Sequence, residues 1–251
     1  MVKGGIAIGI DTDAWAADGF VVVRGLLDAR TVAALQTATD VLEAAGAAFV
    51  ESTAVGKVFY EVQSASGRKR EPAVFPGAFR KITGPSKSTG EGGAAFSQLR
   101  RDARVVEVVT ALGLRRPRCV VDQVNFKHPR VGTPFPFHQD AAFLHGDAKQ
   151  ALQAHGGVNV VVALDAADAG NGGFIVLAGT HGEGELDGQH GYDTSTMAED
   201  RFDGSRRETP SLLPGDAVFF HPHLAHGSEP NRSERRRRLV TLWFVGGVWD
   251  A

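Results

Sequence analysis

The sequence predicts an α+β fold, mainly β, in a single domain spanning residues 1–251. Apolar residues in the first half recur at helical spacing, whereas short β-prone segments dominate from about residue 118 to the end. Neither an internal repeat nor a linker divides the chain, and 251 residues are enough for one domain with a large core. We therefore expect N-terminal helices packed on a sheet formed by the rest.

The N-terminal part is predicted to hold three helices and a strand. Thr12 and Asp13 are candidate caps for a short helix, and the segment GFVVVRGLL after it is β-prone. Asp28 is a candidate cap for a second helix, with apolar residues at helical spacing: Val32, Leu35, Ala38, Val41 and Leu42. A third helix is predicted over residues 97–112, with Leu99, Val105, Val106, Val109 and Leu112. Residues 51–97 show no clear pattern beyond the basic patch Arg68–Arg70 and a Gly/Ser-rich stretch.

The C-terminal part is predicted to be a series of strands. They fall at about 118–127, 134–139, 156–164, 173–177, 217–220 and 238–245. A Gly-Asp turn precedes the fifth strand. Because side chains alternate along a strand, one face of the last run should carry Arg237, Leu239, Thr241 and Trp243.

The triplet His-Gln-Asp at residues 138–140 is a candidate metal site. Side chains at i and i+2 of a strand share a face, so His138 and Asp140 can hold one ion while Gln139 points away. One more histidine would complete a 2-His-1-carboxylate facial triad, which leaves positions open on a non-haem Fe(II). His226, in a loop after the fifth strand, is the preferred third ligand, and His181, His221 and His223 compete with it.

The order of these motifs resembles the phytanoyl-CoA dioxygenase family of Fe(II)/2-oxoglutarate oxygenases. The matching segments are DGFVVVRGLLDARTVAAL, VDQVNFKHP, FHQDAAFL, VNVVVALDAADAGNGGFIVLAGTH and LLPGDAVFFHPHLAHGS, followed by Asn, Ser and Arg. The resemblance covers roughly residues 13 to 246. It implies that His138, Asp140 and His226 hold the metal. It also selects Arg237 from the run Arg235–Arg238 as the ligand of the 2-oxoglutarate carboxylate, assisted by Ser228.

The resemblance also implies a fold and an activity. The β part would be a double-stranded β-helix, a cupin-like jelly roll whose interior can hold a metal and a small ligand. With Fe(II), 2-oxoglutarate and O2, the protein would hydroxylate or otherwise oxidise an unactivated C–H of a small metabolite, and we expect a metabolite of secondary metabolism. Succinate and CO2 would be released. Related halogenases have a small residue where this chain has Asp140, so we expect a hydroxylase rather than a halogenase.

Several further residues are candidates for the pocket. Lys127 and Lys81 are candidates to meet the cosubstrate or an anionic substrate group, although each could equally be a solvated or snorkelling lysine. Substrate-pocket candidates, which could also be plain core, turn or loop residues, are Phe137, Phe143, Asn171 and His181. The long polar segment 183–210 has the composition of a lid over the mouth.

Composition excludes some partners and leaves two rival functions. The formal net charge is −2 and the pI about 6.5, so no attraction to nucleic acid is expected. With Cys119 as the only cysteine and no apolar run of membrane-spanning length, we expect a cytoplasmic protein without membrane contact or an obligate protein partner. The rivals are a metal-binding cupin that is not an oxygenase, such as an isomerase, and a catalytically silent 2-oxoglutarate-binding sensor.

Overall fold

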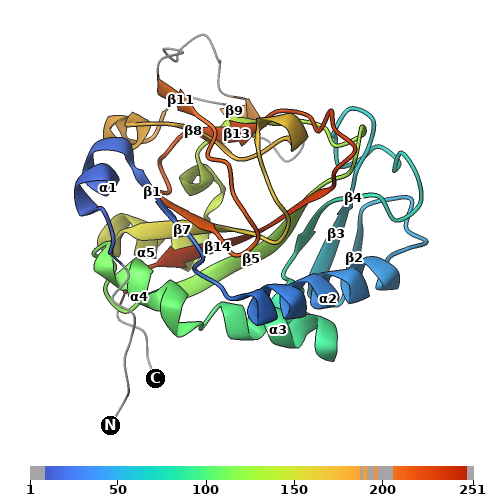
Figure 1. The fold of residues 1–251 in the computed structure, drawn as a ribbon, viewed down its shortest axis with the longest axis horizontal. Helices are drawn as coiled ribbons and strands as arrows, with labels where there is room; N and C mark the ends of the chain where they lie inside the picture. Colours follow the sequence, from blue (N-terminus) through green and yellow to red (C-terminus); the bar gives the residue numbers. More distant parts are fainter. Residues whose placement is uncertain (1–8, 187–188, 191–194, 197–205, 248–251) are drawn as a thin grey trace.

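The computed structural model describes residues 9–186, 189–190, 195–196 and 206–247, and its core is two facing antiparallel sheets (Figure 1). The large sheet has the order β1 (Phe20–Val23), β12 (Ala217–Phe220), β7 (Gly157–Ala163), β14 (Arg237–Val245), β5 (Arg118–Lys127), β4 (Phe79–Thr83), β3 (Val58–Val62) and β2 (Thr53–Val55). The small sheet has the order β11 (Arg207–Glu208), β8 (Ile175–Leu177), β13 (His226–Ser228) and β6 (Phe135–His138). The jelly-roll prediction is confirmed.

Strand β14 is the centre of the large sheet. All nine of its residues are buried, and it pairs with β5 on one side and β7 on the other, so that Leu239 lies between Asn125 and Ala163. Its run of β-branched, leucine and aromatic residues suits a strand covered on both faces. The alternation predicted from the sequence holds, and Arg237, Leu239, Thr241 and Trp243 face the space between the two sheets.

Helices α2 (Ala29–Ala45), α3 (Glu91–Leu99) and α4 (Ala103–Ala111) cover the outer face of the large sheet (Figure 1). The predicted cap of α2 is confirmed, because the Asp28 carboxylate accepts from the Thr31 amide at 2.8 Å. Val32, Leu35, Ala38 and Leu42 join the main core, but Val41, predicted beside them, is 42% exposed. Position 41 lies at the margin of the apolar stripe, whose centre is Leu35, Ala38 and Leu42.

Two helix predictions need correction. The helix predicted over 97–112 is two helices, because the Asp102 carboxylate accepts from the Arg104 amide at 2.9 Å and starts α4 anew. The cap of α1 (Thr12–Asp18) is Asp11, which accepts from the Ala14 amide, rather than Thr12 or Asp13.

Two further regions gave no clear expectation. Residues 51–97 contain β2, β3 and β4, which extend the large sheet, and α5 (Gly146–His155) lies beside β14. In α5 only Ala151 and Leu152 are buried and no side chain caps its start, so the apolar pattern was too weak to reveal it. Short 3-10 turns complete the described chain: Pro85–Lys87, Asp140–Phe143, Ala169–Asn171 and Thr180–Glu183.

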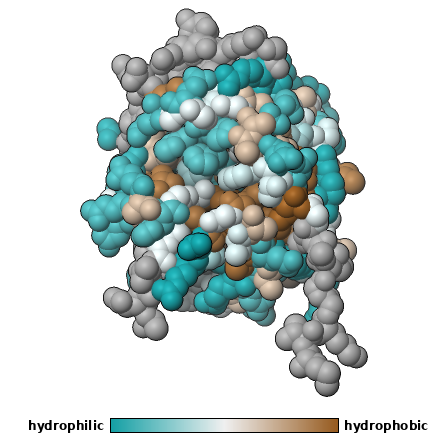
Figure 2. All heavy atoms as spheres, turned by 90° about the vertical axis from the view of Figure 1, so that its left-hand side faces the viewer, coloured by the Kyte–Doolittle hydropathy of each residue, from teal (hydrophilic) through white to brown (hydrophobic). Residues whose placement is uncertain are grey.

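The apolar core lies on both faces of the large sheet. One cluster lies under the helices, and a second lies between the sheets around Phe20, Phe174 and Phe220. On the side shown in Figure 2, hydrophilic side chains surround a band of apolar ones across the middle. Among the described residues, none of the helices has the length and apolar character needed to cross a membrane.

Candidate metal centre and cavity

His138, Asp140 and His226 converge between the two sheets. Strands β6 and β13 pair so that His138 and His226 are direct neighbours, with ring centroids 4.3 Å apart. Asp140 begins the 3-10 turn after β6, and its Oδ1 lies 3.4 Å from the Nε2 of each histidine. One potential ligand atom from each residue lies within 4.8 Å of the others, which is the spacing that a shared ion requires.

The geometry of β13 depends on Gly227. A Cβ at this position would lie 2.8 Å from the Phe135 carbonyl oxygen and 3.2 Å from the Phe137 amide nitrogen. Glycine therefore lets β13 approach β6 closely enough to align the two histidines. Contrary to the prediction of a loop, His226 lies in a short strand.

Each of the three side chains is oriented by a hydrogen-bond partner on the side away from the shared centre. His138 Nδ1 is 2.7 Å from the Pro136 carbonyl oxygen, and His226 Nδ1 is 2.9 Å from that of Leu224. Donation from Nδ1–H to these carbonyls leaves both Nε2 lone pairs pointing at the shared centre. The Asn159 amide donates to Asp140 Oδ2 at 2.7 Å, which leaves Oδ1 to face the imidazoles.

Burial and mutual proximity favour the protonation states that bind a metal. Burial, together with the nearby His226, lowers the pKa of His138, although Asp140 opposes the shift. Burial tends to raise the pKa of Asp140, but the two imidazoles outweigh it and hold this pKa below its usual range. Neutral imidazole and ionised carboxylate are the forms that coordinate ferrous iron.

The competing histidines lie elsewhere. The His221 ring lies between those of His181 and His223, with centroids 5.4 Å from each and the planes tilted, and Trp15 of α1 lies 6.1 Å from it. Within the described part of the chain, His138, Asp140 and His226 form the only group of three or more His, Cys, Asp or Glu side chains with converging ligand atoms. This placement favours His226 as the third ligand.

The three residues lie in the wall of a cavity of about 670 Å³ between the sheets. The predicted residues Arg237, Ser228, Lys81 and Phe143 also line it, and the Phe143 ring meets the His138 ring edge-on at 5.6 Å. Apolar parts of the wall include Val121, Ala142, Val161, Phe174, Phe220, Leu239 and Trp243.

Arg237 is a buried cation without a described carboxylate partner. It is 2% exposed, and its guanidinium donates to the carbonyl oxygens of Gly172 at 2.9 Å and Asn125 at 3.4 Å, whereas its Nε has no partner. Burial lowers its pKa to about 9, although Asp165 opposes the shift. Since Asp165 itself pairs with Arg238, a carboxylate entering the cavity would supply the missing countercharge.

Four predicted pocket residues do not line the cavity. Phe137 lies in a separate cluster with Ile175, Leu177 and Ala225, because alternation along β6 turns it away from the face of His138. Asn171 closes a turn with Asp168, donating to the Ala166 carbonyl and accepting from the Asp168 amide. His181 packs on His221, as described above. For these three, the structure corrects the prediction of a place in the pocket.

Lys127 also lies behind the wall. Its ammonium, 1% exposed, donates to the carbonyls of Thr133 and Glu229. Burial lowers the pKa of Lys127 well below its ordinary value, and the charges of Arg237 and Arg80 lower it further. These contacts place the Lys127 ammonium outside the cavity lining, and its predicted contact with the cosubstrate stays a prediction.

The Gln139 side chain points away from the centre, as predicted, and holds the start of the proposed lid. Its amide donates to the carbonyls of Gly184 and His223 at 2.8 and 2.6 Å, and its oxygen accepts from the Leu186 amide at 2.8 Å. Most of 183–210 lies outside the described residues. The pair β9 (Gln189–His190) and β10 (Ser195–Thr196) is described, and β10 lies beside β6.

We expect Gln139→Leu to lower the free energy of unfolding by about 1–3 kcal/mol for each backbone group left unpaired. Gln139 is fully buried, and leucine cannot replace its three hydrogen bonds. Urea unfolding measures the change, with the exposed Gln153→Leu as the matched control. Equal stability of the two variants would show that the Gln139 hydrogen bonds make no net contribution to the free energy of unfolding.

Sequence reasoning missed Asn159, which lies in the middle of the buried strand β7. An asparagine within the run GVNVVVA was the available signal, because a buried amide needs partners. Similarly, Asn125 on β5 donates to Thr241 on β14 at 2.9 Å within the cavity wall.

We expect Asn159→Ala to weaken Fe(II) binding by about 10–100-fold, the usual effect of removing a residue that orients a metal ligand. Equilibrium dialysis against Fe(II) under anaerobic conditions measures it. Asn171→Ala is the control, since it also removes a buried amide but does not touch a ligand. If both variants bind Fe(II) like the wild type, Asn159 has no role in orienting Asp140.

A sequence model of the phytanoyl-CoA dioxygenase (PhyH) family matches residues 15–239. The chain belongs to this family. Phytanoyl-CoA dioxygenase domain-containing protein 1 of Mus musculus is 27% identical over 197 residues, which cover 72% of this chain and 66% of that protein. The PhyH match thus spans all three residues of the candidate metal centre and Arg237.

Solved structures share the fold of this PhyH chain. EctD from S. alaskensis, crystallised with 2-oxoglutarate and 5-hydroxyectoine, has a TM-score of 0.70 at 20% identity, covering 97% of this chain and 79% of that one. The epimerase SnoN, in complex with Fe3+, alpha ketoglutarate and nogalamycin RO, has a TM-score of 0.67 at 18% identity and covers 94% and 82%. At these identities the likeness shows the fold alone.

Proposed function

We propose that the protein is an Fe(II)- and 2-oxoglutarate-dependent dioxygenase that hydroxylates an unactivated C–H of a small metabolite. The observation that carries this proposal is the pairing of the triad with Arg237, a buried guanidinium without a described countercharge, in the wall of one cavity. Membership in the PhyH family supports it. We also propose that residues 1–251 form one catalytic domain, with 183–210 as a lid.

The residues present fit the metal and the cosubstrate. His138, Asp140 and His226 would hold Fe(II), and three protein ligands leave positions open for small molecules. Arg237 would bind the distal carboxylate of 2-oxoglutarate with its two-pronged fork, with Ser228 beside it in the wall. When bound together with O2, iron and 2-oxoglutarate supply an oxidant for unreactive C–H bonds, with succinate and CO2 as coproducts.

The chain's own residues position the substrate and limit the outcome. The apolar wall around Val121, Phe143 and Trp243 excludes water from the reacting carbon. Asp140 occupies the ligand position that a chloride would need in a halogenase, which favours hydroxylation. The cavity of about 670 Å³ suits a small molecule, and a cytoplasmic location stays a prediction.

Succinate formation without any added substrate tests the proposal. The protein is incubated with Fe(II), 2-oxoglutarate and O2, and succinate is quantified. We expect slow formation above the rate of a protein-free control. A silent 2-oxoglutarate sensor would form none, and a cupin isomerase would have no need of a buried Arg237.

A further inference from the structure

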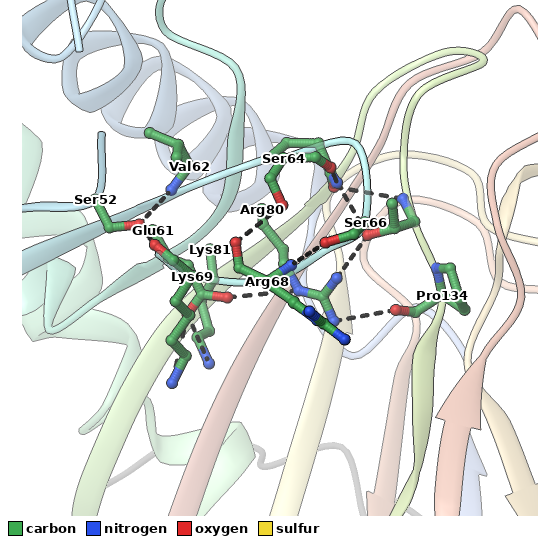
Figure 3. Close-up of polar contacts among 12 residues, drawn as sticks. Ser52, Glu61, Val62, Ser64, Ser66, Arg68, Lys69, Arg80, Lys81 and Pro134 are labelled. Atoms are coloured by element: carbon green, nitrogen blue, oxygen red, sulfur yellow. Dashed lines mark hydrogen bonds and ion pairs between the residues drawn. The ribbon is translucent and has the colours of Figure 1, made fainter. Parts of the chain in front are cut away.

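Charged side chains gather on one wall of the cavity, on β3, β4 and the segment 64–71 between them. Glu61, which is 2% exposed, lies at the centre (Figure 3). Its carboxylate is 3.4 Å from Arg80 Nε, 3.5 Å from Lys81 Nζ and 3.8 Å from Lys69 Nζ. Arg68 follows Gly67 along the same wall. Arg68 and Lys69 of the basic patch seen in the sequence therefore line the cavity.

The lining carries an excess of positive charge. Its five lysines and arginines face two carboxylates, which leaves three positive charges: the cations are Arg68, Lys69, Arg80, Lys81 and Arg237, and the acids are Glu61 and Asp140. Binding Fe(II) together with 2-oxoglutarate, a dication and a dianion, would not change this excess. The whole chain has a net charge of −2, so the excess is a property of the cavity and not of the composition.

The cations of this wall differ in their contacts. The Arg80 guanidinium already has partners within the protein. It donates to Thr133 Oγ1 at 2.6 Å and to the Pro134 carbonyl at 3.0 Å, and it lies 4.0 Å from the centre of the Phe135 ring. Arg68 uses its backbone groups to fix the turn with Ser64 and Ser66. Within the described part of the chain, its guanidinium makes no hydrogen bond or ion pair.

We propose that the substrate is an anion, and that Arg68 and Lys69 bind its carboxylate, phosphonate or phosphate group while its apolar part lies along Val121, Phe143 and Trp243. A cavity with excess positive charge and low-dielectric walls attracts an anion more strongly than an exposed patch does. Arginine binds such oxyanions through two parallel hydrogen bonds. The inference rests on the proposed function, because it places this group in the substrate part of the same cavity.

Four eight-carbon probes test the proposal: octanoate, octylphosphonate, octanamide and octylamine. Calorimetric titrations use the Fe(II) protein under anaerobic conditions with saturating 2-oxoglutarate. The cosubstrate then occupies the part of the cavity at Arg237, and the probe cannot bind there. We expect each anion to bind at least about tenfold more tightly than octanamide or octylamine. The ratio of the two anion affinities identifies the preferred oxyanion, and a preference for either anion supports the proposal.

The double variant Arg68→Gln/Lys69→Gln assigns the effect to this wall. We expect octanoate affinity to fall by about tenfold or more, well beyond any change in 2-oxoglutarate affinity. Arg101→Gln is the matched control, because it removes an exposed charge that does not line the cavity. An equal loss in the control would show a general charge effect and overturn the proposal.

The titrations also separate this inference from the proposed function. If 2-oxoglutarate binds the Fe(II) protein and octanamide binds as tightly as octanoate, the anion site is wrong and the oxygenase proposal stands. If 2-oxoglutarate does not bind, the oxygenase proposal fails. In that case, an octanoate preference that the Arg68/Lys69 variant abolishes and Arg237→Ala retains would still support the anion site.

Discussion

Asp140→Gly should reduce substrate-free succinate formation by at least about 100-fold. Removing a residue that merely orients a ligand costs about 10–100-fold, so removing the only carboxylate ligand should cost more. The change also removes the acceptor of the Asn159 amide and the charge that lies between the two histidines. The measurement is succinate formed per protein at an Fe(II) concentration that saturates the wild type.

Asp13→Gly is the matched control for this variant, because Asp13 is exposed in the first turn of α1, far along the chain from the cavity lining. It should keep wild-type activity. If Asp140→Gly formed succinate at the wild-type rate, Asp140 would not be a ligand of the metal.

Arg237→Ala should weaken 2-oxoglutarate binding by about 30- to 4,000-fold. Truncating one partner of a buried, hydrogen-bonded charge pair costs about 2–5 kcal/mol, which corresponds to this range. Alanine removes the guanidinium that faces the cavity, whereas the neighbouring Arg238 keeps its ion pairs with Asp165 and Asp40. Anaerobic calorimetry with Fe(II) protein and 2-oxoglutarate measures the loss.

Arg237→Lys separates charge from geometry. Lysine keeps the positive charge but not the planar fork, so we expect an intermediate affinity. The exposed Arg235, which pairs with Asp168, provides a control within the same basic run through Arg235→Ala. If Arg235→Ala lost as much affinity as Arg237→Ala, the choice of Arg237 would be wrong.

The candidate metal centre could be located from the sequence because its signal is local and few metals suit its ligand set. Alternation along a strand brings His138 and Asp140 to one face, and the motif order selects His226 from four candidate histidines. The same alternation places Phe137 on the opposite face from His138. Phe135 lines the cavity although it has the parity of Phe137, and the β6–β13 pairing is irregular at this point. The residue number of Phe137, odd where that of His138 is even, already placed its side chain away from the metal centre.

Other parts of the site depend on contacts that the sequence does not encode locally. Asn159 meets Asp140 only because β7 of the large sheet faces the turn that follows β6 of the small sheet. Glu61 and Lys69 lie on β3 and the segment after it, where short strands left no periodic pattern to read. Lys127 lies on β5 and alternates in phase with Gln123 and Asn125, which line the cavity. Its ammonium nevertheless binds backbone carbonyls of two loops behind the cavity wall.

Anaerobic absorption spectroscopy tests the central claim most directly. The protein is loaded with Fe(II) and titrated with 2-oxoglutarate, and Arg237→Ala is titrated in parallel at modest cosubstrate concentration. Chelation of the iron should produce a weak visible charge-transfer band in the wild type that is absent in the variant. A wild-type protein that binds Fe(II) but develops no band would show that 2-oxoglutarate does not chelate the iron, and the oxygenase proposal would be wrong.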